Sequence, residues 1–345
     1  AELKSRIDQA VIPSDFKKNL VERIQRLELL RSSTSYGTNY VLELENTTTF
    51  VKWVTSLPWE SKTQDTLDLV KAQQILDSNH HGLTGVKNRI LEYLASIMLN
   101  AKNNNTDHIS HAPILCLVGL AGTGKTTLAS SIAQALGRNF ERIPFGGMGD
   151  ATALRGQSRG LIDAEPGLII KKLVHAKAKN SVILLDEIDR VSEHARADIM
   201  GVLVELLDPE QNKGFTDHYI DYPFDLSEVL FVSTSNNTTN ISTAVLDRLE
   251  VIQMPSYSDD EKVTIARDHL FPKIRKATGL SETQLSIEQA LWSGIIRPLG
   301  FDSGIRSLER TIEGICRRVA RVIVEGKAQQ VAITTQNLKD YLVML

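Results

Sequence analysis

A glycine-rich stretch at residues 119–126 ends in Lys125 and Thr126, between an apolar run at 113–118 and a helical pattern at 127–136. A strand, a glycine-rich turn and a helix in this order are typical of a phosphate-binding loop. Glycines let successive backbone N–H groups point at phosphate oxygens, Lys125 adds a positive charge, and the Thr126 hydroxyl can bind Mg²⁺. The sequence therefore predicts a site for a nucleoside triphosphate and Mg²⁺. Its expected members are Gly119, Leu120, Ala121, Gly122, Thr123, Gly124, Lys125, Thr126 and Thr127.

Two neighbouring acids, Asp186 and Glu187, directly follow a second apolar run at 183–185. In an open parallel sheet, ligands bind at the carboxyl ends of the strands, so the acids are expected at the same edge as the phosphate-binding loop. Asp186 is predicted to hold Mg²⁺, and Glu187 is predicted to polarise the water that attacks the γ-phosphate. Acids also favour the first turn of any helix, and an ordinary helix start is the alternative for this pair taken alone.

Three further side chains are suited to phosphate chemistry. Asn236 follows a β-rich run at 229–235, and its amide can donate to a γ-phosphate and orient the attacking water. Asparagine is also a common turn residue at the end of a strand, which is the alternative for Asn236. Arg248 and Arg306 follow later in the chain. Surface arginines are usually solvated. Only the order in which all these residues occur supports a functional role for these two.

The hydrophobic periodicity predicts the helices and strands that must position these residues. Helical spacing covers residues 2–30, with a break near Pro13, and returns at 50–57, 65–76 and 86–100. From residue 113 the runs 113–118, 140–143, 181–185 and 228–235 have β character. They alternate with the helical runs 126–136, 167–178 and 195–207, and a long loop lies at 144–166. This alternation is typical of a parallel sheet covered by helices on both faces. After about Tyr257 we expect helical segments only.

These patterns predict an α/β fold in three parts. We expect an all-helical N-terminal segment at 1–66, a large α/β domain with the phosphate-binding loop at 67–255, and a small helical domain at 256–345.

Composition argues against several classes of protein. Lys and Arg number 39 against 42 Asp and Glu, which gives a net charge of −3 and no global attraction to nucleic acid or anionic membranes. Cys116 and Cys316 both lie in apolar surroundings, as expected for buried free thiols in a reducing compartment. There is no long apolar run and no signal peptide, so neither export nor a membrane span is expected. The chain starts at Ala1 inside a helical pattern, which suggests a fragment of a longer protein.

The order of the motifs resembles that of the AAA+ ATPases. A phosphate-binding loop is followed by a strand ending in acids, a strand ending in asparagine, an arginine, and a helical region with a second arginine. A narrower resemblance, to the ATPase part of Lon proteases, rests on the stretch 205–227, on Gly146 and Gly147, on 246–252 and on 57–59. It extends over nearly the whole chain.

This resemblance implies a P-loop AAA+ module with a helical lid, acting as an ATP-hydrolysing motor. It implies a hexameric ring that threads unfolded or damaged polypeptide, with Mg²⁺ and ATP at each seam between subunits. Arg248 would be the arginine finger that reaches the neighbouring subunit's ATP, and Arg306 would be a second sensor that contacts nucleotide in its own subunit. The expected compartment is the cytoplasm, with the mitochondrial matrix or the peroxisome as alternatives.

The sequence departs from the Lon family pattern in two places, which changes what we expect for peptide cleavage and for the grip on substrate. The family's protease domain, with its Ser-Lys dyad, would begin after 331–345, so this chain is not expected to cleave peptides. Where the family places an aromatic residue and an aliphatic one to grip substrate in the pore, this chain has Leu161 and Ile162. Leucine lacks the flat area and rigidity of tyrosine, so a weaker or differently selective grip is expected.

Other motifs carry less weight. Residues 156–160 fit the G-x-S-x-G pattern of serine hydrolases, but that motif needs a preceding strand and a following helix, so Ser158 is not expected to be a nucleophile. His80 and His81 lie in a polar loop, as do His108 and His111, and we expect solvated side chains rather than a metal site.

Two other functions are alternatives to the motor. A nucleotide-dependent binding module would need neither Glu187 nor Arg248, and an ATPase rate stimulated by unfolded protein would exclude it. A nucleic-acid AAA+ machine would need a basic stripe, which the sequence lacks, and a salt-dependent DNA titration would test for one.

Overall fold

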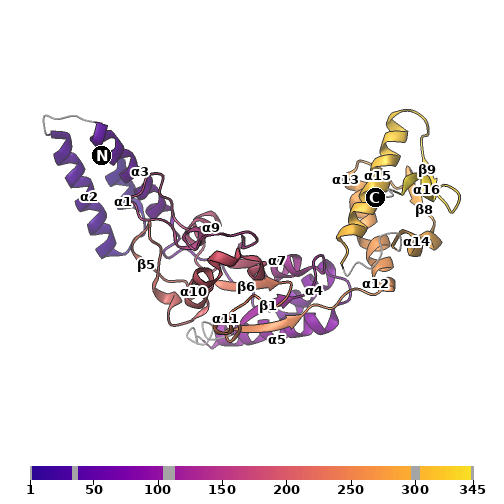
Figure 1. Cartoon of the computed structure of the whole chain (residues 1–345), viewed down its shortest axis with the longest axis horizontal. Coiled ribbons are helices and arrows are strands. Elements are labelled where there is room, and N and C mark those ends of the chain that lie inside the picture. The colour runs from indigo at the N-terminus through magenta and orange to yellow at the C-terminus, as the bar shows by residue number, and fades with distance from the viewer. Residues whose placement is uncertain (1, 33–37, 104–112, 297–303, 343–345) are drawn as a thin grey trace. The chain divides into compact units, whose positions relative to one another are not determined.

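The computed structural model describes residues 2–32, 38–103, 113–296 and 304–342. The chain forms two compact units (Figure 1). Unit 1 consists of residues 1–76, 88–118 and 129–252, and unit 2 consists of residues 77–87, 119–128 and 253–345. Each unit is described by itself below.

A five-stranded sheet forms the centre of unit 1, with the strand order β2-β3-β6-β1-β7. The pairs β1/β6, β2/β3 and β3/β6 are parallel. Every residue of β3 and β6 is buried, as expected for central strands covered on both faces. The strands are β1 (Ile114–Val118), β2 (Phe140–Pro144), β3 (Val182–Asp186), β6 (Leu230–Ser235) and β7 (Leu249–Gln253).

Helices flank this sheet, and their positions confirm the periodicity of the sequence. The phosphate-binding loop leads into α7 (Lys125–Leu136), and α9 (Leu168–Ala176) packs against β2. The helix α10 (Arg196–Leu207) follows β3 and packs against α11 (Thr243–Leu246). The remaining helices of this region are α4 (Leu69–Asn79), α5 (Thr84–Lys102) and α8 (Thr152–Arg155). Both cysteines are buried free thiols, as the sequence predicts.

The N-terminal region is helical, as expected, and an aromatic cluster joins it to the rest of unit 1. Its helices are α1 (Glu2–Gln9), α2 (Ser14–Ser32) and α3 (Thr38–Ser56). Phe16 of α2 stacks on Tyr222 with a ring-centroid distance of 4.1 Å, and it also meets Phe50 and Trp59 edge-on. Tyr222 precedes β5 (Pro223–Phe224), which pairs with β4 (Phe215–Thr216) in a short antiparallel hairpin. None of the described helices is both long and apolar enough to span a membrane.

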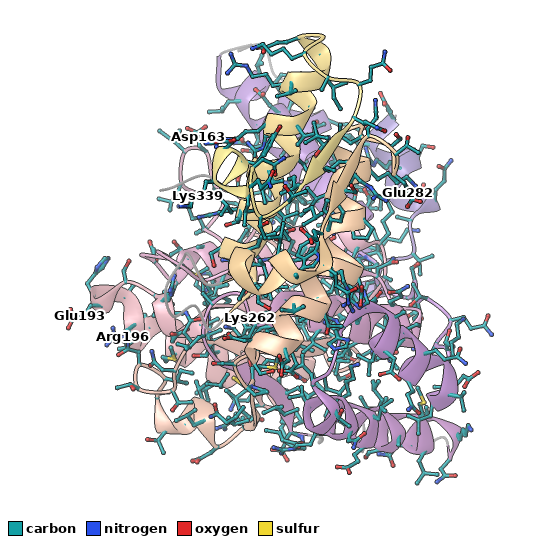
Figure 2. The ribbon with its side chains drawn as sticks, turned by 90° about the vertical axis from the view of Figure 1, so that its right-hand side faces the viewer. Asp163, Glu193, Arg196, Lys262, Glu282 and Lys339 are labelled. Atoms are coloured by element: carbon teal, nitrogen blue, oxygen red, sulfur yellow. The ribbon has the colours of Figure 1, made fainter. Side chains whose placement is uncertain are left out.

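Unit 2 corrects one expectation, because its C-terminal region is not purely helical. It contains α12 (Asp259–Thr264), a π-helical turn (Ile265–Leu270), α13 (Phe271–Ala277), α14 (Trp292–Ile296), α15 (Arg306–Val324) and α16 (Leu338–Tyr341). It also contains β8 (Leu285–Ile287) and β9 (Val331–Ile333), which pair in parallel. Three-residue strands are too short to show a period of two in the sequence, although Ser286 and Ala332 are exposed between more buried neighbours. Figure 2 shows the side chains of this unit, with Lys262 labelled on α12 and Glu282 just before β8.

A buried arginine fastens the segment that connects the N-terminal helices to the sheet. Both oxygens of Asp65 accept hydrogen bonds from Arg138, at 2.8 Å from Nε and 2.7 Å from Nη2. Arg138 also donates to the carbonyl of Glu228 at 3.1 Å, and only 6% of its side chain is exposed. Removal of either partner would leave a desolvated charge, which is costly.

We therefore predict that Asp65→Ala lowers the free energy of unfolding by about 3 kcal/mol, because it leaves the Arg138 guanidinium buried without its carboxylate. Urea unfolding followed by tryptophan fluorescence measures this loss. The matched control is Asp68→Ala, in the same segment, where an exposed carboxylate accepts the Lys71 N–H at the start of α4. The loss of such a helix cap costs about 1 kcal/mol. Equal losses in the two variants would contradict the role given to Arg138.

Candidate active site

The phosphate-binding loop belongs to unit 2, and its backbone has the conformation that its glycines allow. Gly122 and Gly124 have φ angles of 82° and 93°, in the left-handed region that favours glycine. A side chain at Gly119 would come within 2.7 Å of the Met254 Cβ atom. The loop enters α7 at Lys125, so the positive end of the helix dipole lies at the loop.

Lys125 is enclosed by the loop. Its ammonium group donates to the carbonyls of Gly119 and Leu120, the latter at 3.0 Å, and the residue is 8% exposed. Two hydroxyls brace the loop backbone, because Thr123 donates to the Leu120 carbonyl and Thr127 donates to that of Gly124. This arrangement of a charged amine and a helix start is suited to an anion with several oxygens.

The structure corrects the expectation that His80 is solvated. His80 is 6% exposed, and its ring hydrogen-bonds the backbone of Thr127 at the start of α7. Burial, with Lys87 as a second cause, lowers the His80 pKa to about 4, so the ring is neutral at pH 7. His81 lies against His269, with ring centroids 5.8 Å apart, and His108 and His111 fall outside the described residues.

Tyr257 is a second neighbour of the loop that sequence reasoning missed. Its hydroxyl lies 3.4 Å from the Thr123 carbonyl, and burial, with Glu261 as a second cause, raises its pKa to about 12. Both His80 and Tyr257 come to the loop from distant segments. Their positions in the sequence do not indicate this contact, whereas the glycines and Lys125 form one short motif that can be recognised.

Arg306 is the first residue of α15, and the segment just before it contacts the phosphate-binding loop within unit 2. The N–H of Ile305 donates to the Gly122 carbonyl at 3.2 Å. A side chain at Gly304 would lie 2.5 Å from the Ala121 carbonyl oxygen, so only glycine permits this approach. Arg306 itself is exposed. The contact of Arg306 with nucleotide, which the family resemblance implies, remains a prediction.

The two acids lie in unit 1, at the carboxyl end of β3, and one hydroxyl binds the side chain of Asp186 and the backbone of Glu187. Asp186 is 3% exposed and accepts hydrogen bonds from Arg142, at 2.7 Å from Nε, and from the Thr234 hydroxyl of β6. The same Thr234 oxygen accepts the backbone N–H of Glu187 at 2.9 Å. Neither Thr234 nor Arg142 was predicted, because neighbouring strands bring them to the acids.

Glu187 has an unusual backbone conformation, with a φ angle of 59°. Left-handed residues other than glycine are uncommon and cluster at functional sites. Its carboxylate lies 3.6 Å from Arg190, and a side chain at Gly146 would come within 3.1 Å of its Oε2 atom. Gly146 thus leaves room for the carboxylate, and the hydrogen bond from Glu187 to Thr234 helps to hold the bend.

Asn236 follows β6 and is linked to the segment that carries the acids. Its N–H donates to Asp189 Oδ1 at 3.2 Å, and Asp189 is 4% exposed. Val118 at the end of β1 pairs with Ser235, and Leu185 of β3 pairs with Ser233. The ends of β1, β3 and β6 therefore share one edge of the sheet, so Asp186, Glu187 and Asn236 are brought together as predicted.

Arg248 has different partners. Its guanidinium donates to the Ala244 carbonyl at 2.7 Å and to Asp208 Oδ2 at 2.8 Å, and its side chain is 28% exposed. The structure therefore ties Arg248 to α10 and α11 rather than to Asp186 and Glu187.

Leu161 and Ile162 lie at the tip of the loop 156–166, with 60% and 92% of their surfaces exposed. Asp217, which is 1% exposed, fastens the base of this loop by accepting the Gly167 N–H at 2.7 Å. Burial raises the Asp217 pKa despite its three backbone hydrogen bonds. The G-x-S-x-G stretch follows the short helix α8 rather than a strand, which removes Ser158 as a candidate nucleophile.

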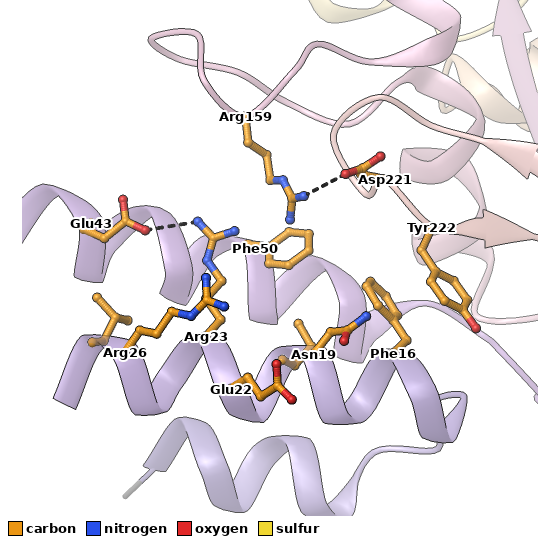
Figure 3. A pocket seen from close by; sticks show the side chains of 12 residues that line it. Phe16, Asn19, Glu22, Arg23, Arg26, Glu43, Phe50, Arg159, Asp221 and Tyr222 are labelled. Atoms are coloured by element: carbon orange, nitrogen blue, oxygen red, sulfur yellow. Dashed lines mark hydrogen bonds and ion pairs between the residues drawn. The ribbon is translucent and has the colours of Figure 1, made fainter. Parts of the chain in front are cut away.

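The same loop rests on the N-terminal helices. The Arg159 guanidinium lies over the Phe50 ring, 4.1 Å from its centroid, and pairs with Asp221 at 3.3 Å (Figure 3). A cavity of about 500 Å³ opens beside them, between α2, α3 and Tyr222. A cation over an aromatic face is attractive, so the contact helps to anchor the loop that presents Leu161 and Ile162.

Two family models match the chain. Residues 115–257 match the model of the ATPase family associated with various cellular activities (AAA), and residues 276–331 match that of the Lon protease AAA+ ATPase lid domain. The Lon protease of Lawsonia intracellularis is 42% identical over 341 residues, which cover 99% of this chain and 39% of that protein. Lon protease 1 of Bacillus subtilis is 41% identical over 340 residues, covering 99% of this chain and 42% of that protein. The chain thus spans well under half the length of these relatives.

The contact between Gly304 and the phosphate-binding loop leads to a prediction. Gly304→Ala should weaken ATP binding about tenfold, because the new methyl group would push the start of α15 away from the loop and misplace Arg306. Titration with a fluorescent ATP analogue gives the dissociation constant. Gly294→Ala is the matched control in the same unit, since the nearest atom to its added methyl group lies 4.0 Å away. Unchanged affinity in a folded Gly304→Ala variant would contradict the role of this contact.

Proposed function

Because this chain belongs to the Lon protease family, through its AAA+ ATPase and lid regions, we propose that it is a motor that hydrolyses ATP to pull unfolded polypeptide through a hexameric ring. The observation that carries this proposal is that the single hydroxyl of Thr234 binds both the Asp186 carboxylate and the backbone N–H of Glu187. A phosphate-binding loop alone serves any nucleotide-binding protein. Hydrolysis additionally requires a second acid, and the fixed backbone of Glu187 places one directly after Asp186.

The chemistry of the side chains fits ATP with Mg²⁺. The backbone of the phosphate-binding loop and the Lys125 ammonium suit the phosphates, and the Thr126 hydroxyl and the Asp186 carboxylate are the oxygen ligands that Mg²⁺ prefers. When bound, Mg²⁺ would neutralise charge that develops on the phosphate oxygens. Arg142 pairs with Asp186 at 2.6 Å and balances the charge of this acid.

The remaining roles follow from chemistry and from the family. Glu187 would take a proton from the water whose oxygen attacks the γ-phosphorus, and ADP would leave with the bridging oxygen. The Asn236 amide would orient that water and donate to the γ-phosphate. Arg248 would act across the seam on the neighbour's ATP, and Arg306 would report the nucleotide state of its own subunit to the lid.

The loop tip would transmit the motion to the substrate. Leu161 and Ile162 present apolar side chains to solvent on a loop anchored by Asp217 and Arg159. Exposed apolar side chains on an anchored loop are suited to gripping the side chains of an unfolded chain. We place this motor in the quality control of damaged proteins, in a reducing compartment such as the cytoplasm.

Glu187→Gln tests the proposal. The amide keeps the size of the side chain but cannot accept a proton, so ATP hydrolysis should fall by roughly 10²-fold or more while ATP binding stays within about twofold. The ATPase rate should be measured with and without an unfolded protein, because a threading motor is stimulated by its substrate and a nucleotide sensor is not.

The matched control is Glu193→Gln, an exposed acid that precedes α10 and is labelled in Figure 2. This variant should keep the parent rate. A Glu187→Gln variant that hydrolyses ATP as fast as the parent would remove Glu187 as the base. A parent protein that binds ATP but is not stimulated by unfolded protein would contradict threading.

A further inference from the structure

The guanidinium of Arg248 is held in a defined orientation by its own subunit. Nη1 donates to the Ala244 carbonyl and Nη2 donates to Asp208, so both terminal nitrogens are fixed. Ala244 lies on α11, one helical turn before Arg248, whereas Asp208 directly follows the last residue of α10. The two bonds use two of the five N–H donors of the guanidinium among the described residues. The rest of the fork can bind another group, since the side chain is partly exposed.

Asp208 is itself fixed by the backbone. Its Oδ1 atom accepts the N–H groups of Glu210 at 3.0 Å and Gln211 at 3.3 Å, and its carbonyl accepts the N–H of Asn212 at 2.9 Å. The other oxygen, Oδ2, binds Arg248. One carboxylate therefore divides its oxygens between a turn and a guanidinium. The hydrogen bond from Arg248 lowers the Asp208 pKa, so this acid stays ionised at neutral pH.

The pair joins the two stretches of chain that follow the catalytic strands. The helix α10 follows the acids at the end of β3, and α11 follows Asn236 at the end of β6. The carbonyl of Arg248 also accepts the N–H of Ile114, the first residue of β1. Arg248 is thus fixed to the sheet by its backbone and to α10 by its side chain.

We propose that Asp208 is the positioning residue for Arg248, holding its guanidinium ready for the phosphate of the neighbouring subunit. This inference rests on the proposed function, because it needs Arg248 to act across a seam. A long arginine side chain has many rotamers, and fixing one of them before the phosphate arrives reduces the entropy lost in the transition state. A carboxylate on Nη2 fixes that rotamer, and the N–H groups that bind neither Asp208 nor Ala244 can bind phosphate.

Asp208→Asn separates this role from a structural one. The asparagine carbonyl oxygen can still accept the N–H groups of Glu210 and Gln211, so the turn is kept. Its NH₂ group replaces Oδ2 and cannot accept from Arg248. The matched control is Asp225→Asn, because Asp225 is exposed and its Oδ1 atom likewise accepts a backbone N–H, that of Ser227 at 2.9 Å. Both variants should show the thermal midpoint of the parent.

In assembled rings, Asp208→Asn should lower kcat for ATP about tenfold with KM within about twofold, a fraction of the 10³–10⁵ that an arginine finger supplies. Asp225→Asn should leave both constants unchanged. The deciding readout is subunit mixing. Lys125→Ala subunits lack a working phosphate loop but offer an intact Asp208 and Arg248 to their neighbours.

Rings mixed in equal parts from Asp208→Asn and Lys125→Ala subunits should recover activity. With random placement, half of the intact nucleotide sites face an intact finger, so the rate per Asp208→Asn subunit should rise about fivefold. Differently sized tags show that the rings contain both variants. Rings that mix Arg248→Ala with Lys125→Ala subunits should also recover and serve as the reference.

Three outcomes would overturn the inference. A parent-like kcat in Asp208→Asn rings shows that Arg248 needs no partner. A reduced kcat without recovery on mixing, where Arg248→Ala does recover, shows that Asp208 serves its own subunit's site instead. If neither mixture recovers activity, Arg248 does not act across the seam. That part of the proposed function is then wrong, and so is the role of Asp208.

Discussion

One buried hydroxyl determines how the acids of this protein are presented. Thr234 donates to Asp186 and accepts the N–H of Glu187, so a single side chain of β6 binds the last residue of β3 and the residue that follows it. The parallel register that pairs Leu185 with Ser233 makes this possible. The left-handed backbone of Glu187 is unfavourable by itself and persists because the surrounding bonds hold it. The direction of the proposed base therefore depends on the pairing of two strands.

In unit 2, close contacts between backbone segments hold the phosphate-binding loop. Glycines at 119, 122 and 304 allow the phosphate-binding loop to contact Met254 and the start of α15. A side chain at Gly119 or Gly304 would come within 2.7 or 2.5 Å of the facing segment and would force it away. A change at the phosphates can thus reach the lid through backbone contacts, without a long chain of side chains. Lys125, enclosed by the loop, and the neutral His80 complete its surroundings.

Features encoded by contiguous residues could be predicted from the sequence, and features made by distant segments could not. The phosphate-binding loop, the acid pair and the alternation of strands and helices each depend on a local pattern, and the structure has them where expected. Thr234 binds Asp186, Tyr257 contacts the phosphate-binding loop and Asp208 binds Arg248, each from a distant segment, and burial of His80 was missed for the same reason. The strands β8 and β9 were too short for their period to appear. The domain boundaries at 66/67 and 255/256 and the roles of the site residues remain predictions.

Replacement of the Thr234 hydroxyl tests the central claim most directly. Thr234→Val keeps the shape of the side chain but leaves Asp186 and the Glu187 N–H without their shared partner, whereas Thr234→Ser keeps the hydroxyl. Steady-state ATP hydrolysis should fall about 10²-fold in Thr234→Val, with nucleotide binding retained, and should stay within about threefold of the parent in Thr234→Ser. A folded Thr234→Val protein that hydrolyses ATP at the parent rate would show that the acids do not depend on this hydroxyl.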